Sequence, residues 1–207
     1  MIYVELSSGL GNQFFQYAMA RKIQIDTNEA VSYCYKGKKG YLEAERKISI
    51  DRFSIDSGWK REEPCPYYSK HRTIVTIEKL IAKLDSISNI SVEKQKEHKQ
   101  KEIRFLEKMG RITHQEHIYL PLVLCSKTKD IFISGLWHHP MFFETIKGVL
   151  FNELELRDKQ SLPKDILSKI VSTESVAVHI RRGDYLNYPY YIVADIWKIV
   201  SYNFLLP

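Results

Sequence analysis

Hydrophobic and polar positions at the start of the chain follow first the period of a strand and then the period of a helix. In MIYVEL, residues 1–6, apolar side chains fall on alternate positions, which predicts a strand with one apolar side. The residues on this side are Ile2, Val4 and Leu6. SSGLG then predicts a tight turn, and from Asn12 to residues 26–28 the apolar positions recur at spacings of three and four, which predicts a helix. With a second strand predicted at AVSYCY, residues 30–35, the chain opens as a parallel α/β sheet.

The same two periods predict the later elements. Residues 36–72 are rich in Gly, Pro and charge, which favours a loop-dominated insertion. The elements predicted beyond it are helices at residues 74–85, 141–151 and 162–171 and strands at residues 131–137 and 176–180. This alternation predicts an α/β protein with a domain boundary within residues 155–175.

The charge of the chain suits an anionic ligand without indicating a nucleic-acid-binding protein. The net charge is +6, but 31 basic residues stand against 25 acidic ones and no single-sign block is present. Residues 93–108 hold six basic and four acidic residues, which leaves two interpretations, an RNA-binding tract or a solvated helix face. The mixed signs and the helix-stabilising pair of Glu97 and Lys101 favour the solvated face.

Cysteine usage and the absence of leader signals indicate an intracellular setting. Cys34, Cys65 and Cys125 are far apart and lack a CxxC spacing, which favours a reducing compartment over a disulfide framework or a zinc ribbon. The first residues lack the basic start of a signal peptide and include Glu5. The apolar stretches are shorter than the roughly 20 residues of a membrane helix. We therefore expect a cytoplasmic protein, and its basic charge leaves peripheral membrane contact open.

The first loop that could carry chemistry is SGLGNQ, residues 8–13. Glycine permits positive φ angles and close approach of a ligand to the backbone. The helix that follows offers free N–H groups and a positive dipole end to a phosphate or a sugar hydroxyl. Phe14 stands where a dinucleotide fingerprint has its third glycine, and the Lys-Ser/Thr of a P-loop is missing. A plain turn explains the same residues equally well.

The second loop with possible chemistry is VAVHIRRGDY, residues 176–185. Alternation along a strand sends His179 and Arg181 to one side and Arg182 to the other, so the two arginines need not share a partner. One guanidinium suits a phosphate, to which it donates two hydrogen bonds at once, and Asp184 is the nearest carboxylate to orient either arginine. The alternative is an exposed strand end with an ordinary Arg–Asp surface pair.

Other candidate chemistry is weaker. His114 and His117 stand three residues apart and His138 and His139 are adjacent, but no acidic or cysteine partners complete a metal-ligand set, so we expect no metal site. No GxSxG or Cys–His pattern predicts a covalent nucleophile.

Three segments, taken in order, resemble a known family. GLGNQFFQYAMA near the N-terminus, ISGLWHHPMFFETIKGVL and then VAVHIRRGDY are similar to motifs of the family 11 glycosyltransferases, the α-1,2-fucosyltransferases. Each motif by itself is modest, whereas the ordered set is specific. The likeness runs from residue 1 to residue 185 and spans most of the chain.

The resemblance implies a GT-B-like fold, in which two Rossmann-type α/β domains face each other. Residues 1–160 would form the N-terminal, acceptor-side domain and residues 161–207 the start of a GDP-fucose-binding domain. The implied reaction transfers L-fucose from GDP-fucose to the 2-hydroxyl of a terminal galactose, with inversion and without a metal or another cofactor. The product would belong to glycan or surface polysaccharide synthesis, with no nucleic acid as partner.

The resemblance also implies roles for particular residues. Arg181 would bind the donor pyrophosphate and stabilise the negative charge that grows on the leaving GDP, which makes Arg181 and Asp184 the catalytic positions. Arg182 and Asp184 would hold the geometry of the loop, and His179 would assist at the nucleotide. The residues expected to line the donor site from the N-terminal side are Gly9, Gly11, Asn12 and Gln13.

The chain departs from the family pattern in two ways. Ser8 stands where the family usually has Gly, and Phe14 where it has Met or Leu. Family members continue with further strands and helices after HxRRGDY, whereas residues 186–207 are all that follow Tyr185 here, so we expect a truncated nucleotide domain. An inactive remnant that binds nucleotide or sugar without turnover is one alternative function. A protein that binds RNA or an anionic surface through residues 93–108 is another.

Overall fold

The computed structural model describes two compact units of the chain. The described residues are 1–36, 47–87, 92–114, 130–158, 163–174 and 176. One unit comprises Met1–Lys38 with Arg46–Asp158, and the other comprises Lys39–Glu45 with Lys159–Pro207. The division of the chain into an acceptor-side domain and a GDP-fucose-binding domain stays a prediction.

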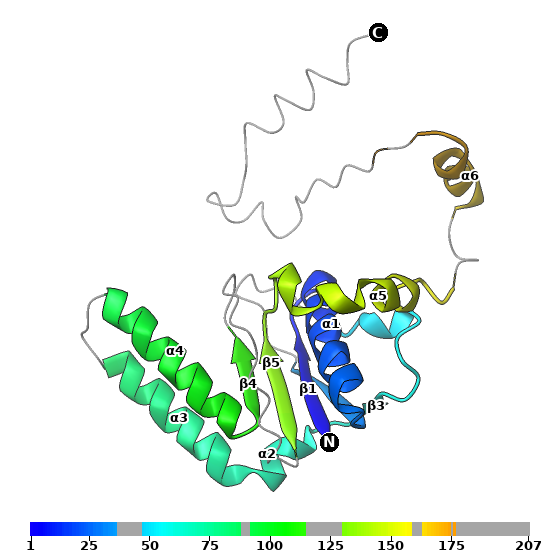
Figure 1. Ribbon diagram of the computed structural model, residues 1–207. Helices are drawn as coiled ribbons and strands as arrows, with labels where there is room; N and C mark the ends of the chain where they lie inside the picture. Colours follow the sequence, from blue (N-terminus) through cyan, green and yellow to red (C-terminus); the bar gives the residue numbers. More distant parts are fainter. Residues whose placement is uncertain (37–46, 88–91, 115–129, 159–162, 175, 177–207) are drawn as a thin grey trace. The chain divides into compact units, whose positions relative to one another are not determined.

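The first unit is built on a five-stranded parallel sheet (Figure 1). Its strands are β1 (Ile2–Ser7), β2 (Val31–Lys36), β3 (Lys60–Arg61), β4 (Arg111–His114) and β5 (Ile131–Gly135). Their order across the sheet is β3-β2-β1-β5-β4, and every neighbouring pair is parallel. The predictions for β1, β2 and β5 are confirmed, whereas β3 and β4 were not predicted from the sequence. The parallel sheet fits a Rossmann-like α/β fold.

Strand β1 lies at the centre of the sheet and is buried on both faces. Its predicted apolar side is confirmed, because Ile2, Val4 and Leu6 are all 0% exposed and belong to the core beneath helix α1 (Leu10–Thr27). Tyr3 points to the opposite face and joins a second core cluster with Phe132 of β5. A parallel sheet covered on both faces has such continuous burial.

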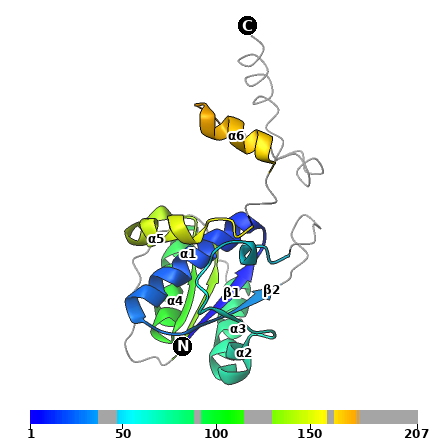
Figure 2. The same ribbon diagram turned by 90° about the vertical axis from the view of Figure 1, so that its right-hand side faces the viewer.

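Helices cover the two faces of the sheet. Figure 2 shows α1 and α5 (Lys147–Glu153) on one side and α2 (Pro66–Lys70) and α3 (Arg72–Ile87) on the other. The loop-dominated insertion expected at residues 36–72 therefore contains α2, strand β3 and a 3₁₀ turn at Ile50–Arg52. Helix α3 confirms the helix predicted at residues 74–85. No helix in the described part of the chain is long and apolar enough to cross a membrane.

Helix α4 (Val92–Lys108) confirms that the charged tract is helical, but the helix is not solvated on all sides. Glu97 and Lys101 form the expected pair, with 3.9 Å between Nζ and Oε1 and both side chains exposed. Ile103 and Leu106, however, are buried. The solvated face is therefore only one side of α4, and the other side packs beside β4 (Figure 1).

The segment after β5 differs from the continuous helix predicted at residues 141–151. Two 3₁₀ turns, Pro140–Phe142 and Glu144–Ile146, precede α5, which begins only at Lys147. Phe142, Ile146 and Leu150 are buried, and their spacing of four imitated a helix in the sequence. The tighter turns let Phe142 pack edge-on against the buried Trp137, with ring centroids 5.1 Å apart.

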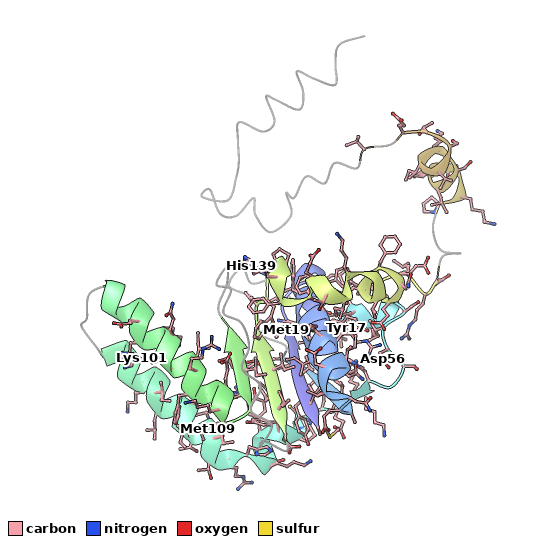
Figure 3. The ribbon with its side chains drawn as sticks, in the orientation of Figure 1. Tyr17, Met19, Asp56, Lys101, Met109 and His139 are labelled. Carbon is pink, nitrogen blue, oxygen red and sulfur yellow. The ribbon has the colours of Figure 1, made fainter. Side chains whose placement is uncertain are left out.

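Polar side chains fasten α1 to α5. The Tyr17 hydroxyl donates to Glu153 Oε2 at 2.6 Å and accepts from the Asp56 backbone N–H at 3.0 Å. The Arg21 guanidinium lies 2.8 Å from the carboxylate of Asp56 and 2.8 Å from that of Glu153. Figure 3 labels Tyr17 beside Asp56. Burial raises the pKa of Tyr17, and its bond to Glu153 raises it further, so the hydroxyl stays a neutral donor.

Helix α6 (Lys164–Ser172) is the described helix of the second unit and confirms the helix predicted at residues 162–171. Among its exposed side chains are Ile166, Leu167, Ile170 and Val171. The strand predicted at residues 176–180 lies outside the described residues, except for Val176, which is exposed.

The first prediction concerns Asp130, which links the N-terminal residue to His71 at the end of α2. Its carboxylate lies 2.9 Å from His71 Nε2 and 3.4 Å from the Met1 ammonium. Burial by itself raises the pKa of Asp130, but the His71 hydrogen bond and the ammonium charge outweigh burial and lower it. A pKa below the unfolded value stabilises the fold above pH ~4, and this stabilisation is lost as pH falls through the folded pKa. Asp130→Asn should therefore lower the free energy of unfolding by about 1 kcal/mol at pH 7.

Urea unfolding across pH 2–7 measures this effect. The deficit should disappear at the acid end, where the native carboxyl is itself protonated. The exposed Asp51 is the matched control, and Asp51→Asn should change stability by less than about 0.5 kcal/mol. A deficit that persists at pH 2 would contradict the electrostatic explanation.

Candidate functional site

The order of the strands indicates a candidate ligand-binding position at the carboxyl ends of β1 and β5. The connection from β1 runs through α1 to β2 on one side, whereas β5 lies on the other side next to β4. Open parallel sheets bind ligands outside the carboxyl ends of the strands where the order changes direction in this way. We call the residues that the two following loops bring there the β1–β5 site: Ser8, Gly9, Gly11, Asn12 and His138.

A buried glutamine joins the two strand ends at this position. The β1–β5 ladder runs only from Ile2 to Val4, so hydrogen bonds between strands do not hold Ser7 and Gly135 together. Gln16 of α1 replaces them: its Oε1 accepts from the Ser7 N–H at 2.8 Å, and its Nε2 donates to the Gly135 carbonyl at 3.0 Å. Gly135 has a φ of 105°, which only glycine adopts without strain. The floor of the β1–β5 site is therefore fixed.

The turn after β1 contains a left-handed residue, but it is not one of the expected glycines. Ser8 has a φ of 63°, whereas Gly9 has a φ of −76° and serves as the N-cap of α1. The Ser8 carbonyl accepts from Gln13 Nε2 at 3.0 Å and from the Tyr35 hydroxyl at 3.2 Å, and these bonds hold the conformation. A non-glycine residue in this region costs roughly 1–2 kcal/mol. The strained position is thus the one where the related family usually has glycine.

Gln13 lies inside the protein. Its side chain is 0% exposed, Nε2 donates to the carbonyls of Ser8 and Lys47, and Oε1 accepts from the N–H groups of Ser49 and Ile50 at 2.9 and 3.2 Å. A glutamine amide has two donor hydrogens and two acceptor lone pairs, so all four are used within the chain. Gln13 therefore shapes the loop from beneath and offers no hydrogen bond to a ligand.

Gly11 lies on the surface in the first turn of α1, which begins at Leu10 rather than at Asn12. Apart from its two chain neighbours and the nearby backbone of α1, a Cβ added at Gly11 would meet no atom of the described residues within 4 Å. The first four N–H groups of any α-helix lack intrahelical partners and carry the positive end of its dipole. Gly11 therefore leaves this helix end open to the backbone, which suits an anionic ligand.

Asn12 and His138 bring the two loops into contact. His138 Nε2 lies 3.0 Å from Asn12 Oδ1, and its ring packs edge-on against Phe15 at 5.1 Å. The neighbouring His139, labelled in Figure 3, accepts from the Met141 N–H at 3.3 Å and turns the chain into the first 3₁₀ segment. Among the described residues, no three His, Cys, Asp or Glu side chains gather closely enough to hold a metal ion.

His179, Arg181, Arg182 and Asp184 all lie outside the described residues, and their roles stay predictions. Gly9, Gly11, Asn12 and Gln13 are described, and the structure brings the first three to the β1–β5 site with Gln13 beneath them.

Sequence reasoning missed Gln16 and assigned no binding role to His138. The sequence contained a signal for Gln16, because this polar residue falls on the same side of α1 as the apolar Tyr17 and Ala20. His138 was visible only as one of two adjacent histidines, and its partner Asn12 is 126 residues away in sequence.

The buried amide of Gln13 leads to the second prediction. Gln13→Met keeps the length of the side chain but removes the acceptor of two backbone N–H groups and one donor from each of two carbonyls, so the free energy of unfolding should fall by on the order of 2–4 kcal/mol. Denaturant unfolding measures it, with Gln100→Met on the exposed side of α4 as the control, expected to change by less than about 0.5 kcal/mol. Equal effects of the two substitutions would show that the Gln13 amide does not hold the loop.

Comparison with known proteins now identifies the family. Residues 1–201 match the model of glycosyl transferase family 11. The alpha-1,2-colitosyltransferase of Escherichia coli is 24% identical over 189 residues, which cover 90% of this chain and 56% of that protein. The chain thus spans little more than half the length of this relative. No solved structure matches it. Because the family model covers nearly the whole chain, and its glycine-asparagine loop lies at the carboxyl end of β1, the protein belongs to glycosyl transferase family 11.

Proposed function

We propose that the protein transfers L-fucose from GDP-fucose to the 2-hydroxyl of a terminal galactose, with inversion at the anomeric carbon. Membership of glycosyl transferase family 11 supports a glycosyltransferase, which binds a nucleotide-sugar donor and a glycan acceptor. The α-1,2 linkage in the name of the E. coli relative agrees with a 2-hydroxyl acceptor. The observation that carries the proposal is the open N-terminus of α1 at the carboxyl end of β1, where a diphosphate has N–H donors to meet.

The proposed chemistry needs charge stabilisation more than it needs a nucleophile from the protein. As the acceptor oxygen bonds to the anomeric carbon and gives up its proton to a base, the bond from that carbon to the diphosphate breaks and the electron pair leaves with GDP. A positive group placed at the diphosphate stabilises this state more than the ground state. Arg181 is the proposed guanidinium, with Asp184 orienting the loop around it. The proposed mechanism uses no metal.

Colitose is a second candidate for the transferred sugar. The name of the E. coli relative specifies it. Colitose differs from fucose by the absence of one hydroxyl group. A site that hydrogen-bonds this hydroxyl would reject the deoxy sugar strongly, whereas an apolar wall would discriminate weakly. The choice between the two donors is therefore a question of one polar contact.

Transfer of labelled sugar to lactose tests the proposal directly. We expect turnover with GDP-fucose in excess chelator, and faster turnover with GDP-colitose would assign the second sugar. Saturable GDP binding without transfer to any galactoside would instead support a remnant that binds without turnover. RNA binding that is unaffected by GDP but weakens steeply as the salt concentration rises would favour an RNA-binding protein.

The two arginines of the second motif provide an internal comparison. Arg181→Ala should abolish GDP binding, because the pyrophosphate would lose its bidentate partner. Arg182→Ala should mainly lower the melting temperature, since the alternation of the predicted strand turns it away from the donor. Calorimetric titration with GDP and thermal unfolding measure the two effects. Equal losses of binding would contradict this division of roles.

Gly11 tests the proposed contact at α1. In Gly11→Ala the added methyl group meets open space in the protein, and alanine favours the helix by up to about 1 kcal/mol, so folding should be unaffected or slightly improved. A diphosphate held against the backbone would meet the methyl group, and the KM for the donor should rise about tenfold or more. The control is Gly148→Ala in α5, another glycine with open space around its Cβ position, which should leave the KM unchanged. An unchanged KM in Gly11→Ala would place the donor elsewhere.

A further inference from the structure

The hydrogen bond between His138 and Asn12 determines which atom of each side chain donates and which accepts. Asn12 Oδ1 has no hydrogen to give, so His138 Nε2 must carry the proton in the 3.0 Å contact between them. An imidazole Nε2–H donates in this way both in the neutral tautomer that carries it and in the charged ring. The bond therefore turns the Asn12 oxygen toward His138 and its amide nitrogen away from it.

The remaining hydrogen-bonding capacity of the loop is concentrated in Asn12. Gln13 uses all four of its positions within the chain, and Gln16 uses three of its four. By contrast, the Asn12 amide nitrogen has no hydrogen-bond partner among the described residues, and Asn12 is only half-buried. Of the three side-chain amides of this motif, Asn12 is thus the one that keeps donors for a ligand.

Neighbouring side chains hold His138 in place. Its ring lies edge-on to Phe15 at 5.1 Å, and Phe15 lies on the same helix as Asn12. The preceding residue, Trp137, is 0% exposed. His138 is therefore held by groups that do not depend on a ligand, as a residue that orients another must be.

We propose that His138 is a positioning residue that acts through Asn12. The Asn12 amide has two orientations, related by a rotation of 180°. His138 keeps it in the orientation that presents the N–H donors, rather than the carbonyl oxygen, at the N-terminus of α1. Without His138 the amide can turn by 180° and place its oxygen where an anion would bind. The inference rests on the proposed function, and the ligand class is the diphosphate of a nucleotide sugar.

The first test needs no ligand. Long-range ¹H–¹⁵N correlation spectra of the labelled chain at pH 7.5 should show a proton on Nε2 of His138. Asn12→Ala removes the acceptor, so the population of the Nε2–H tautomer in the neutral ring should fall toward a mixture. A wild-type His138 in the Nδ1–H tautomer would overturn the proposal.

The second test is a double-mutant cycle on sugar transfer from GDP-fucose. His138→Leu removes the donor and should lower kcat/KM about tenfold, whereas His138→Gln, whose Nε2 can also donate to Asn12, should stay within about threefold of the wild type. Because the effect passes through Asn12, His138→Leu should cost less than about twofold when added to Asn12→Ala. Thermal unfolding of each variant shows whether a loss of activity is a loss of fold.

The outcomes separate this inference from the proposed function. Losses that multiply in the double variant, in a chain that transfers sugar, overturn the positioning role and leave the proposed function intact. A folded wild-type chain that neither binds GDP nor transfers sugar overturns both. Loss of activity in His138→Gln equal to that in His138→Leu would show that the imidazole itself, and not the donated hydrogen bond, is needed, and would also overturn the proposal.

Discussion

The Gln16 amide is the interaction on which the proposed site depends. Strands β1 and β5 pair over three residues only, and beyond Val4 no ladder holds their carboxyl ends together. Gln16 spans this interval by bonding Ser7 on one strand and, on the other, Gly135, which lies 119 residues beyond Gln16 in the sequence. Because the ligand position of an open parallel sheet lies at this change of strand order, one buried side chain sets the geometry of the floor on which both loops stand.

The neighbouring side-chain amides of Gln13 and Asn12 have different roles, one in structure and the other, as we propose, in binding. A buried amide contributes most to the fold when every donor and acceptor is satisfied, which is the state of Gln13. A residue in that state has nothing left for a ligand. Asn12 is half-exposed and satisfied on one side only, so the same chemical group serves as scaffold at one position and as a candidate ligand contact at the next.

The elements that the sequence predicted well are those whose apolar pattern extends over several turns or alternations. α1, α3 and α6 and strands β1, β2 and β5 belong to this class. β3 has two residues, too few for any period, and β4 has four. The spacing of four between Phe142 and Ile146 predicts a helix. The same spacing also fits two 3₁₀ turns that fold the apolar side chains onto Trp137, which is what the structure has.

The sequence by itself determined the class of the fold, the position of the glycine-asparagine loop between a strand and a helix, and the family, because these depend on short-range periods and on ordered motifs. Only the tertiary structure decided what each polar side chain of the loop does. Ser8 rather than a glycine takes the left-handed conformation because Gln13 and Tyr35 hold its carbonyl. Asn12 differs from Gln13 because its partner comes from His138, 126 residues away. Hydrogen-bond satisfaction is set by groups brought together through folding, and no local pattern of residues records it.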